Sequence, residues 1–178
     1  SRHSASDDGP FALNVRLQAP LENDDCFAAT PIGHGTYVGT TAGATPDGES
    51  VCDCLPAPPD VWYSYEAFCE GDLLIDTCGS TFDTVLSVFT GCPGVVENGI
   101  ACNDDCIDGP CGDTLQSCLV VPVLPGTSYW IRVASCGGPG DYELRVELLA
   151  PPPVNDDCAD ALPVGEGVLP FSTCGAST

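Results

Sequence analysis

Residues 140–148 read Gly-Asp-Tyr-Glu-Leu-Arg-Val-Glu-Leu. The apolar residues Tyr142, Leu144, Val146 and Leu148 alternate with charged ones, and this period-two pattern predicts a β-strand with one buried face. Weaker or similar runs occur at residues 36–41, 61–66, 72–77, 82–89, 115–123 and 129–134. Gly- and Pro-rich turns separate the runs, and no stretch keeps a helical period. The chain is therefore predicted to be all-β, an antiparallel β-sandwich or jelly roll of about 7–9 strands.

The same strand pattern occurs near the N-terminus. Residues 9–20 parallel residues 140–151, and the apolar positions Phe11, Leu13, Val15 and Leu17 match those of the later strand. We therefore interpret the beginning of the chain as the last strand of a preceding repeat.

A second internal repeat has an offset of 132 residues. Asn23-Asp24-Asp25-Cys26 recurs as Asn155-Asp156-Asp157-Cys158, and 11 of the 24 aligned positions in residues 23–46 and 155–178 are identical. A period of this length is the size of a domain, which indicates beads on a string rather than a solenoid. We expect residues 1–22 to be the last strand of one repeat plus a linker, 23–150 a complete repeat, 151–154 a Pro-rich linker and 155–178 the start of the next. The absence of Met predicts that the chain is a segment of a longer protein.

Thirteen cysteines in 178 residues indicate a disulfide framework formed in an oxidising compartment, so we expect a secreted or cell-surface protein. Zinc is the alternative, through Cys52 and Cys54 or through Cys102, Cys106 and Cys111, but the C-x2-C pairs typical of zinc sites are missing. The candidates for disulfides are Cys26, Cys52, Cys54, Cys69, Cys78, Cys92, Cys102, Cys106, Cys111, Cys118 and Cys136. Because the total is odd, at least one cysteine is free, pairs with another chain or has its partner outside this segment.

The net charge of -22 comes from 26 acidic residues against four Arg and no Lys. Such a charge excludes a nucleic-acid backbone or an anionic membrane as a direct partner, since both would repel the chain. No apolar run of about 18 residues is present, so membrane insertion is not expected either.

The abundant Asp residues suggest a calcium site. Ca²⁺ prefers carboxylate and carbonyl oxygens, and Asn103, Asp104 and Asp105 offer several on one turn. Asp83 lies inside an apolar run, where a bare carboxylate would be costly without a partner. The second group of candidate metal ligands is Asp24, Asp25, Asp156 and Asp157. The alternative is that these acids are solvated and only cap turns.

Catalytic signals are weak. The chain has two His residues, His3 and His34, and the position one repeat after His34 is Glu166. No Gly-x-Ser-x-Gly elbow occurs, so no enzymatic activity is predicted. Trp62 and Trp130 alternate out of phase with their apolar neighbours and could form a carbohydrate platform, although large aromatics in sandwiches more often belong to the core.

Several motifs resemble a known family, the bacterial pre-peptidase C-terminal-like β-sandwich domains, in the Cys-rich, tandemly repeated form found in large secreted proteins. The resemblance covers residues 23–150 and both flanks. The motifs that carry it are the Asn-Asp-Asp-Cys openings and residues 60–65, 77–86, 101–105, 125–133 and 140–144. It implies a β-sandwich that attaches, spaces or assembles rather than catalyses, and some such domains bind calcium.

These observations together predict a structural or adhesive extracellular domain. Its units would associate head to tail into a filament, stalk or biofilm matrix, with its own neighbours as partners and calcium as a stabilising ion. A strand donated between protomers is a variant of this assembly. The alternative is a non-catalytic accessory module of a large secreted hydrolase, which binds a polysaccharide or another substrate. Disulfide connectivity, repeat number and O-glycosylation are not readable from the sequence.

Overall fold

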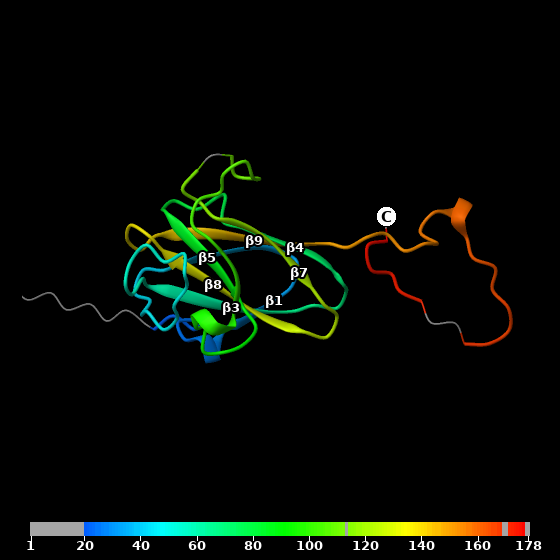
Figure 1. Cartoon of the computed structure of the whole chain (residues 1–178), viewed down its shortest axis with the longest axis horizontal. Coiled ribbons are helices and arrows are strands. Elements are labelled where there is room, and N and C mark those ends of the chain that lie inside the picture. The colour runs from blue at the N-terminus through cyan, green and yellow to red at the C-terminus, as the bar shows by residue number, and fades with distance from the viewer. Residues whose placement is uncertain (1–19, 113, 169–170, 177–178) are drawn as a thin grey trace, which may run out of the picture.

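The computed structural model describes residues 20–112, 114–168 and 171–176, which contain nine strands in two sheets (Figure 1). The five-stranded sheet has the order β1 (Thr30–Ile32), β3 (Asp60–Glu66), β8 (Ser128–Ser135), β5 (Thr84–Phe89) and β6 (Gly99–Asn103). The four-stranded sheet has the order β2 (Gly35–Thr40), β9 (Asp141–Leu149), β4 (Gly71–Asp76) and β7 (Cys118–Val123). Three short 3-10 helices complete the described elements: η1 (Cys26–Ala28), η2 (Val96–Asn98) and η3 (Cys158–Asp160). The all-β sandwich prediction is confirmed.

All seven alternating runs that lie in the described residues form strands, with ends that differ by up to three residues. β1 and β6 were not predicted, because a three-residue strand and a Gly-Ile-Ala-Cys-Asn strand are too short to show a period. The pairing of β1 with β3 is parallel, which departs from the antiparallel expectation, while the other pairs are antiparallel. The predicted strand at residues 9–19 lies outside the described residues. Among the described helices, none has the length and apolarity needed to cross a membrane.

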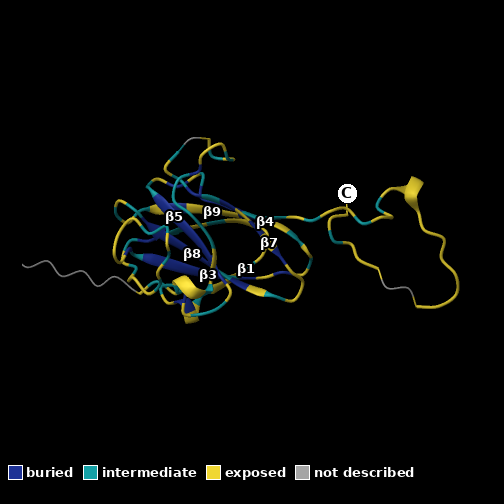
Figure 2. Cartoon of the chain, viewed as in Figure 1, coloured by how far each residue is buried: buried dark blue, intermediate teal, exposed yellow. Residues whose placement is uncertain are grey.

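The main core lies between the two sheets. Alternate residues of each strand point inward, so that Val61, Tyr63 and Tyr65 of β3 meet Tyr142 and Leu144 of β9 in one buried cluster. Figure 2 shows β3, β5 and β8 as largely buried, whereas the C-terminal segment and much of the loops are exposed. Burial of this alternating face at about 25 cal/mol per Å² of apolar surface is the main force that holds the sheets together.

A smaller cluster covers the opposite face of the five-stranded sheet. It contains Trp62 of β3, Phe89 of β5 and Cys26, each at most 1% exposed. The rings of Trp62 and Phe89 are tilted by 46° at a centroid distance of 5.4 Å. The idea that Trp62 forms an exposed carbohydrate platform is therefore wrong, because the loops on this face bury it. Trp130 is half-buried beside the same cluster.

The segment after the Pro linker repeats the local backbone geometry of the segment that opens the sandwich. Helix η3 begins at Cys158, and η1 begins at the equivalent residue Cys26, 132 positions earlier in the sequence. The positive φ of Gly175 (71°) matches that of Gly43 (94°). Four backbone hydrogen bonds recur at the same offset: Asp24→Leu21 and Asp156→Pro153, Ala28→Asp25 and Asp160→Asp157, Ala29→Cys26 and Ala161→Cys158, Ala44→Thr41 and Ala176→Thr173.

The strands of this opening segment do not recur. β1 and β2 pair with β3 and β9, but no strand is assigned among the described residues 153–168 and 171–176. Turns and single helical turns close on neighbouring residues, whereas a strand needs a partner from elsewhere in the fold. The turns of the opening geometry, which depend on local contacts, thus recur in the described part of the C-terminal segment. Its strands, which depend on partners elsewhere in the fold, do not.

Candidate functional site

The acidic cluster, defined as Asp83, Asp104 and Asp105, is the strongest candidate metal-binding site. Asp83 immediately precedes β5, and the other two follow β6. Because these strands are antiparallel neighbours in which Leu86 faces Asn103, the beginning of one and the end of the other meet at the same end of the sheet. The structure brings carboxylate oxygens of all three residues within 4.8 Å of one another. The expectation that Asp83 lies inside a strand is corrected, since β5 begins one residue later.

The electrostatics of the acidic cluster are unfavourable without a cation. Burial raises the pKa of Asp83 and of Asp104, and the charges of the neighbouring acids raise both further. One oxygen of each, Oδ1, is buried and has no hydrogen-bond partner among the described residues. The two described Arg residues bind other acids: Arg132 binds Asp53 and Asp60, and Arg145 contacts Asp76 and Glu147.

Asn103 shapes this site rather than lining it. Its amide oxygen accepts a hydrogen bond of 2.9 Å from the Cys118 backbone, and its amide nitrogen donates one of 3.0 Å to the Asp105 carbonyl. The Asp83 carbonyl accepts from the Cys136 backbone N–H at 2.9 Å. The carboxylates are therefore the oxygens that remain for a cation. The Asn103 amide and the carbonyls of Asp83 and Asp105 fix the conformation of the loops instead.

A buried hydroxyl cluster and several disulfides hold the acidic loops in place. Ser117 Oγ donates to the Asp104 carbonyl at 2.8 Å, and its backbone N–H donates to the hydroxyls of Thr77 and Thr84. Cys102, Cys106 and Cys136 lie close in sequence or space to the acids, and each forms a disulfide. The six disulfides are Cys26–Cys92, Cys52–Cys102, Cys54–Cys136, Cys69–Cys174, Cys78–Cys111 and Cys106–Cys118, which leaves Cys158 free.

These bonds decide between disulfides and zinc. All the cysteines proposed as alternative zinc ligands are bonded to each other or to other cysteines. All 11 predicted disulfide cysteines are in bonds, and Cys174 joins them from the C-terminal segment. A bonded cysteine has no thiolate to offer a metal, so an oxygen-binding ion such as Ca²⁺ fits the acidic cluster better.

The other predicted ligands lie elsewhere. Both carboxylate oxygens of Asp24 accept hydrogen bonds from Thr45, at 2.6 and 2.9 Å, and Asp25 caps η1 through the N–H of Phe27 at 2.8 Å. Asp25 thus caps a local turn, as the alternative interpretation held, whereas Asp24 joins two segments that are 21 residues apart in the sequence. Asp156 is half-buried and Asp157 is exposed, both in the segment after the linker.

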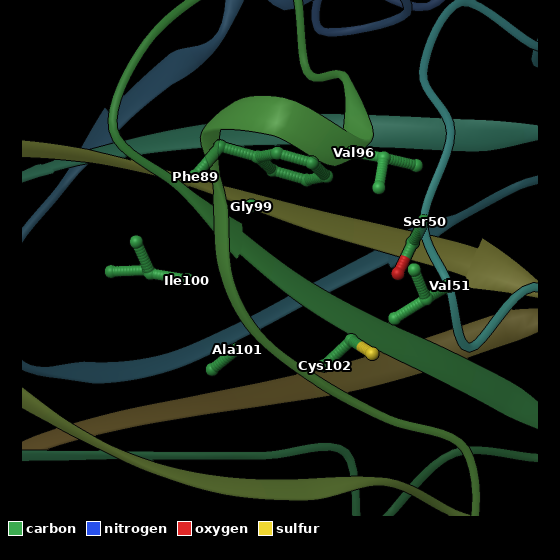
Figure 3. A pocket seen from close by; sticks show the side chains of 8 residues that line it. All are labelled: Ser50, Val51, Phe89, Val96, Gly99, Ile100, Ala101 and Cys102. Atoms are coloured by element: carbon green, nitrogen blue, oxygen red, sulfur yellow. The ribbon is translucent and has the colours of Figure 1, made fainter.

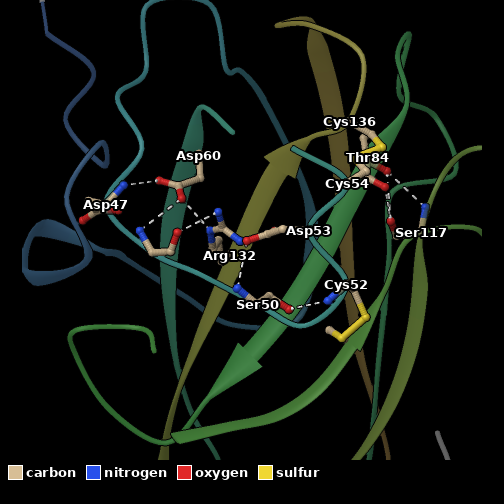
Figure 4. A network of polar contacts seen from close by, with 12 residues as sticks. Asp47, Ser50, Cys52, Asp53, Cys54, Asp60, Thr84, Ser117, Arg132 and Cys136 are labelled. Carbon is tan, nitrogen blue, oxygen red and sulfur yellow. Dashed lines mark hydrogen bonds and ion pairs between the residues drawn. A yellow bond between two sulfur atoms is a disulfide. The ribbon is translucent and has the colours of Figure 1, made fainter. Parts of the chain in front are cut away.

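The sequence reasoning missed a second group, the Arg132 network, defined as Arg132 with Asp47, Asp53 and Asp60 (Figure 4). Arg132 Nε lies 2.5 Å from Asp60 Oδ2, its Nη1 lies 2.7 Å from Asp53 Oδ1, and its Nη2 donates to the Gly48 carbonyl at 3.0 Å. Asp47 binds the indole N–H of Trp62. The sequence signal that could have indicated this network is Arg132 itself. It is one of only four Arg residues, and it lies between apolar Ile131 and Val133 in an alternating strand.

Arg132 and Asp60 are fully buried, so the network pins loop residues 47–53 over the outer face of the five-stranded sheet. Burial raises the pKa of Asp60 to about 7, although the Arg132 charge opposes that shift. The network has no open face toward solvent at Asp60, which favours a structural role.

A hollow of about 160 Å³ lies beside β6 and η2 (Figure 3). Its wall includes Val51, Phe89, Val96 and Ile100, all apolar. Ligand sites for small molecules usually measure about 300–1,000 Å³ and carry several polar groups, so this hollow does not favour a saccharide.

His34 binds the Tyr65 hydroxyl through Nε2 at 3.1 Å.

No family model and no curated protein matches the chain. Among solved structures, the pre-peptidase C-terminal domain of collagenase from Bacillus anthracis is 16% identical, with a TM-score of 0.42; the match covers 75% of this chain and 100% of that one. A periplasmic inhibitor of g-type lysozyme from Aeromonas hydrophila is 15% identical, with a TM-score of 0.44, covering 67% and 95%. These values assign no function. One matching structure nevertheless belongs to the group of domains that the sequence resembles.

Proposed function

We propose that this chain is a structural unit of an extracellular head-to-tail array, in which calcium stabilises each β-sandwich. The observation that carries the proposal is the recurrence of the opening geometry in residues 153–176. A second copy of helix η1 and its turns, placed directly after the linker, is what a following sandwich would need to begin.

The free cysteine supports the same interpretation. Cys158 is equivalent to Cys26, which is buried and bonded to Cys92 in the sandwich. In a following unit, Cys158 would have an equivalent partner, and the odd number of cysteines in this segment would be explained. The five disulfides within residues 26–136 suit a protein that persists outside the cell, since they constrain the unfolded chain.

A covalent array is favoured over a donated strand. β9 pairs with β2 on one side and with β4 on the other, so it fills the middle of its own sheet. A strand from a neighbour, such as residues 9–19, would have to displace it to enter the same place. The intact mass of the native assembly distinguishes the two: a polyprotein has a mass of many units, and a strand-donation polymer dissociates into single ones.

We assign calcium to the acidic cluster. Three carboxylates, two of which have a buried oxygen with no hydrogen-bond partner among the described residues, supply the hard ligands that Ca²⁺ prefers. Burial and, after it, the charges of the neighbouring acids raise the pKa of Asp83 and Asp104, and the ion would offset both. The disulfide-held loops would then be joined by an ion at one end of the sandwich.

Calcium binding is expected to be lost in the double variant Asp83→Asn/Asp104→Asn. The two substitutions remove the charges that hold the ion and keep the size of the side chains. For a dissociation constant of about 0.1–1 mM, about 10 mM Ca²⁺ should stabilise the parent protein by about 1–3 kcal/mol. Isothermal titration calorimetry and thermal unfolding of chelated protein measure both effects.

The matched control is Asp141→Asn, which removes one exposed charge outside the acidic cluster. It should bind Ca²⁺ like the parent. Equal binding heats in the parent and the double variant would refute the assignment to Asp83 and Asp104.

Electron microscopy of the native secreted protein tests the array itself. We expect filaments with an axial spacing of one sandwich, which become less regular when calcium is chelated. Dispersed single particles with and without the chelator would contradict the array, whatever the outcome of the calcium titration.

A further inference from the structure

One disulfide differs from the other five in what it connects. Five bonds join cysteines within residues 26–136, whereas Cys69–Cys174 spans 105 residues and crosses the Pro linker. Cys69 lies in the turn between β3 and β4. Its partner lies in the segment that repeats the opening geometry, so this bond leaves the sandwich.

The two ends of the bond meet where the chain leaves the sandwich. Asp72 at the start of β4 faces Leu149 at the end of β9, which places the β3–β4 turn beside the linker. Figure 1 shows the C-terminal segment looping away from the sandwich and returning, so that its red part, residues 171–176, lies close to the linker. A Cβ atom on Gly175 would lie 2.4 Å from the Pro151 carbonyl oxygen and 2.6 Å from that of Ala150. The segment therefore packs closely on the linker at the residue next to the disulfide.

The surface beside this junction is hollowed and partly apolar. The hollow measures about 580 Å³ and includes Val123, Leu124 and Leu149 in its wall. Leu124 and Leu149 are 59% and 51% exposed. Exposed leucines at a covalent attachment point favour a neighbouring domain that covers them.

We propose that Cys69–Cys174 is a crosslink between consecutive units, which fixes the start of the following copy against the linker end of this sandwich. The inference rests on the proposed function, because it takes residues 155–178 as the opening of a second unit. In that unit Cys174 is equivalent to Ala42, just after β2. The crosslink thus joins the β3–β4 turn of one unit to the end of β2 in the next.

Ala42 also shows that the crosslink is not part of every junction. The complete unit has no cysteine at this position, so it receives no such bond from a preceding unit. Where the bond exists, two covalent attachments, the linker and the disulfide, hold the neighbours. One attachment allows rotation about the linker, and the second removes most of that freedom, so the crosslinked junction is stiff.

The bond forms by ordinary disulfide exchange. The two thiols of Cys69 and Cys174 lose two protons and two electrons in total, and the disulfide of a secretory thiol–disulfide oxidant accepts both and becomes a dithiol. The five bonds inside the sandwich need the same oxidant, so the crosslink requires no additional chemistry.

The test uses the full chain and the double variant Cys69→Ser/Cys174→Ser, which leaves no unpaired partner behind. Non-reducing peptide mapping of the parent should yield one crosslinked peptide that contains both cysteines. In hydrogen exchange, the Ala176 amide, bonded to Thr173, should exchange at least about tenfold faster in the variant, while amides of β9 keep their protection.

The unfolding midpoint distinguishes a junction bond from a bond that stabilises the domain. The variant should lower the midpoint less than the control Cys54→Ala/Cys136→Ala, which opens a bond inside the sandwich, because without the crosslink the C-terminal segment gains freedom in the folded state as well as in the unfolded one. A missing crosslinked peptide, or a midpoint lowered as far as in the control, would overturn the crosslink and leave the array standing. Native protein without filaments would overturn the array even if the peptide were found.

Discussion

Replacing Arg132 by Met is expected to lower the free energy of unfolding by about 3–5 kcal/mol near neutral pH. The guanidinium is fully buried, and it contacts Asp60, which is also fully buried, and Asp53. Met fills a similar volume but cannot pair with a carboxylate, so Asp60 would have to stay in the interior either as an unpaired charge or as a protonated acid, and both are costly. Urea unfolding of the parent and the variant, with calcium held constant, measures the loss.

The loss should depend on pH in a defined direction. Burial raises the pKa of Asp60 to about 7 from an ordinary 3.8, and removal of Arg132 raises it further. Because the folded-state pKa lies above the unfolded one, the folded state binds the proton more tightly, and this contribution to stability is lost as the pH rises through the folded pKa. The variant should therefore lose less stability at about pH 5 than at about pH 8.

Two further variants make the result specific. Arg145→Met removes a side chain that is 46% exposed and should cost no more than about 1 kcal/mol. Arg132→Met/Asp60→Asn removes both buried charges and should recover part of the stability. An equal loss for Arg132→Met at both pH values would refute the role assigned to Asp60.

Replacing Leu144 by Ala is expected to cost about 2–5 kcal/mol. Leu144 is fully buried in β9, which lies between β2 and β4 in the four-stranded sheet, and its side chain packs in the core between the sheets. Truncation leaves a cavity that rigid neighbouring strands cannot close. Chemical unfolding of the chelated protein measures the effect without a contribution from calcium.

The control is Leu115→Ala, the same substitution at a side chain that is 57% exposed. It should change the free energy of unfolding by no more than about 0.5 kcal/mol. A similar loss in both variants would show that β9 does not hold the sandwich together as described.

The candidate metal site was predictable in its residues but not in its arrangement. Asp83 and the Asp104-Asp105 pair were recognised as acids that are hard to place without a cation. Only the pairing of β5 with β6 shows that they share one end of a sheet. Asp24 and Asp25 stand in a similar Asn-Asp-Asp sequence, yet Asp24 accepts hydrogen bonds from Thr45 and Asp25 accepts one from Phe27 at the start of η1. The sequence shows how many carboxylates are available, but only the tertiary structure shows which of them are already occupied by hydrogen bonds within the protein.

By itself, the sequence determined the strands with a clear period of two, the all-β class, the repeat and the disulfide-bonding character of the cysteines, because each of these is written in local spacing or composition. The tertiary structure alone decided the short strands β1 and β6, the cysteine pairing and the burial of Arg132. These depend on contacts between residues far apart in the chain, whose free energy is gained only when the sheets assemble. The C-terminal segment shows the boundary directly: its turns form from local bonds, whereas no strand is assigned among its described residues 153–168 and 171–176.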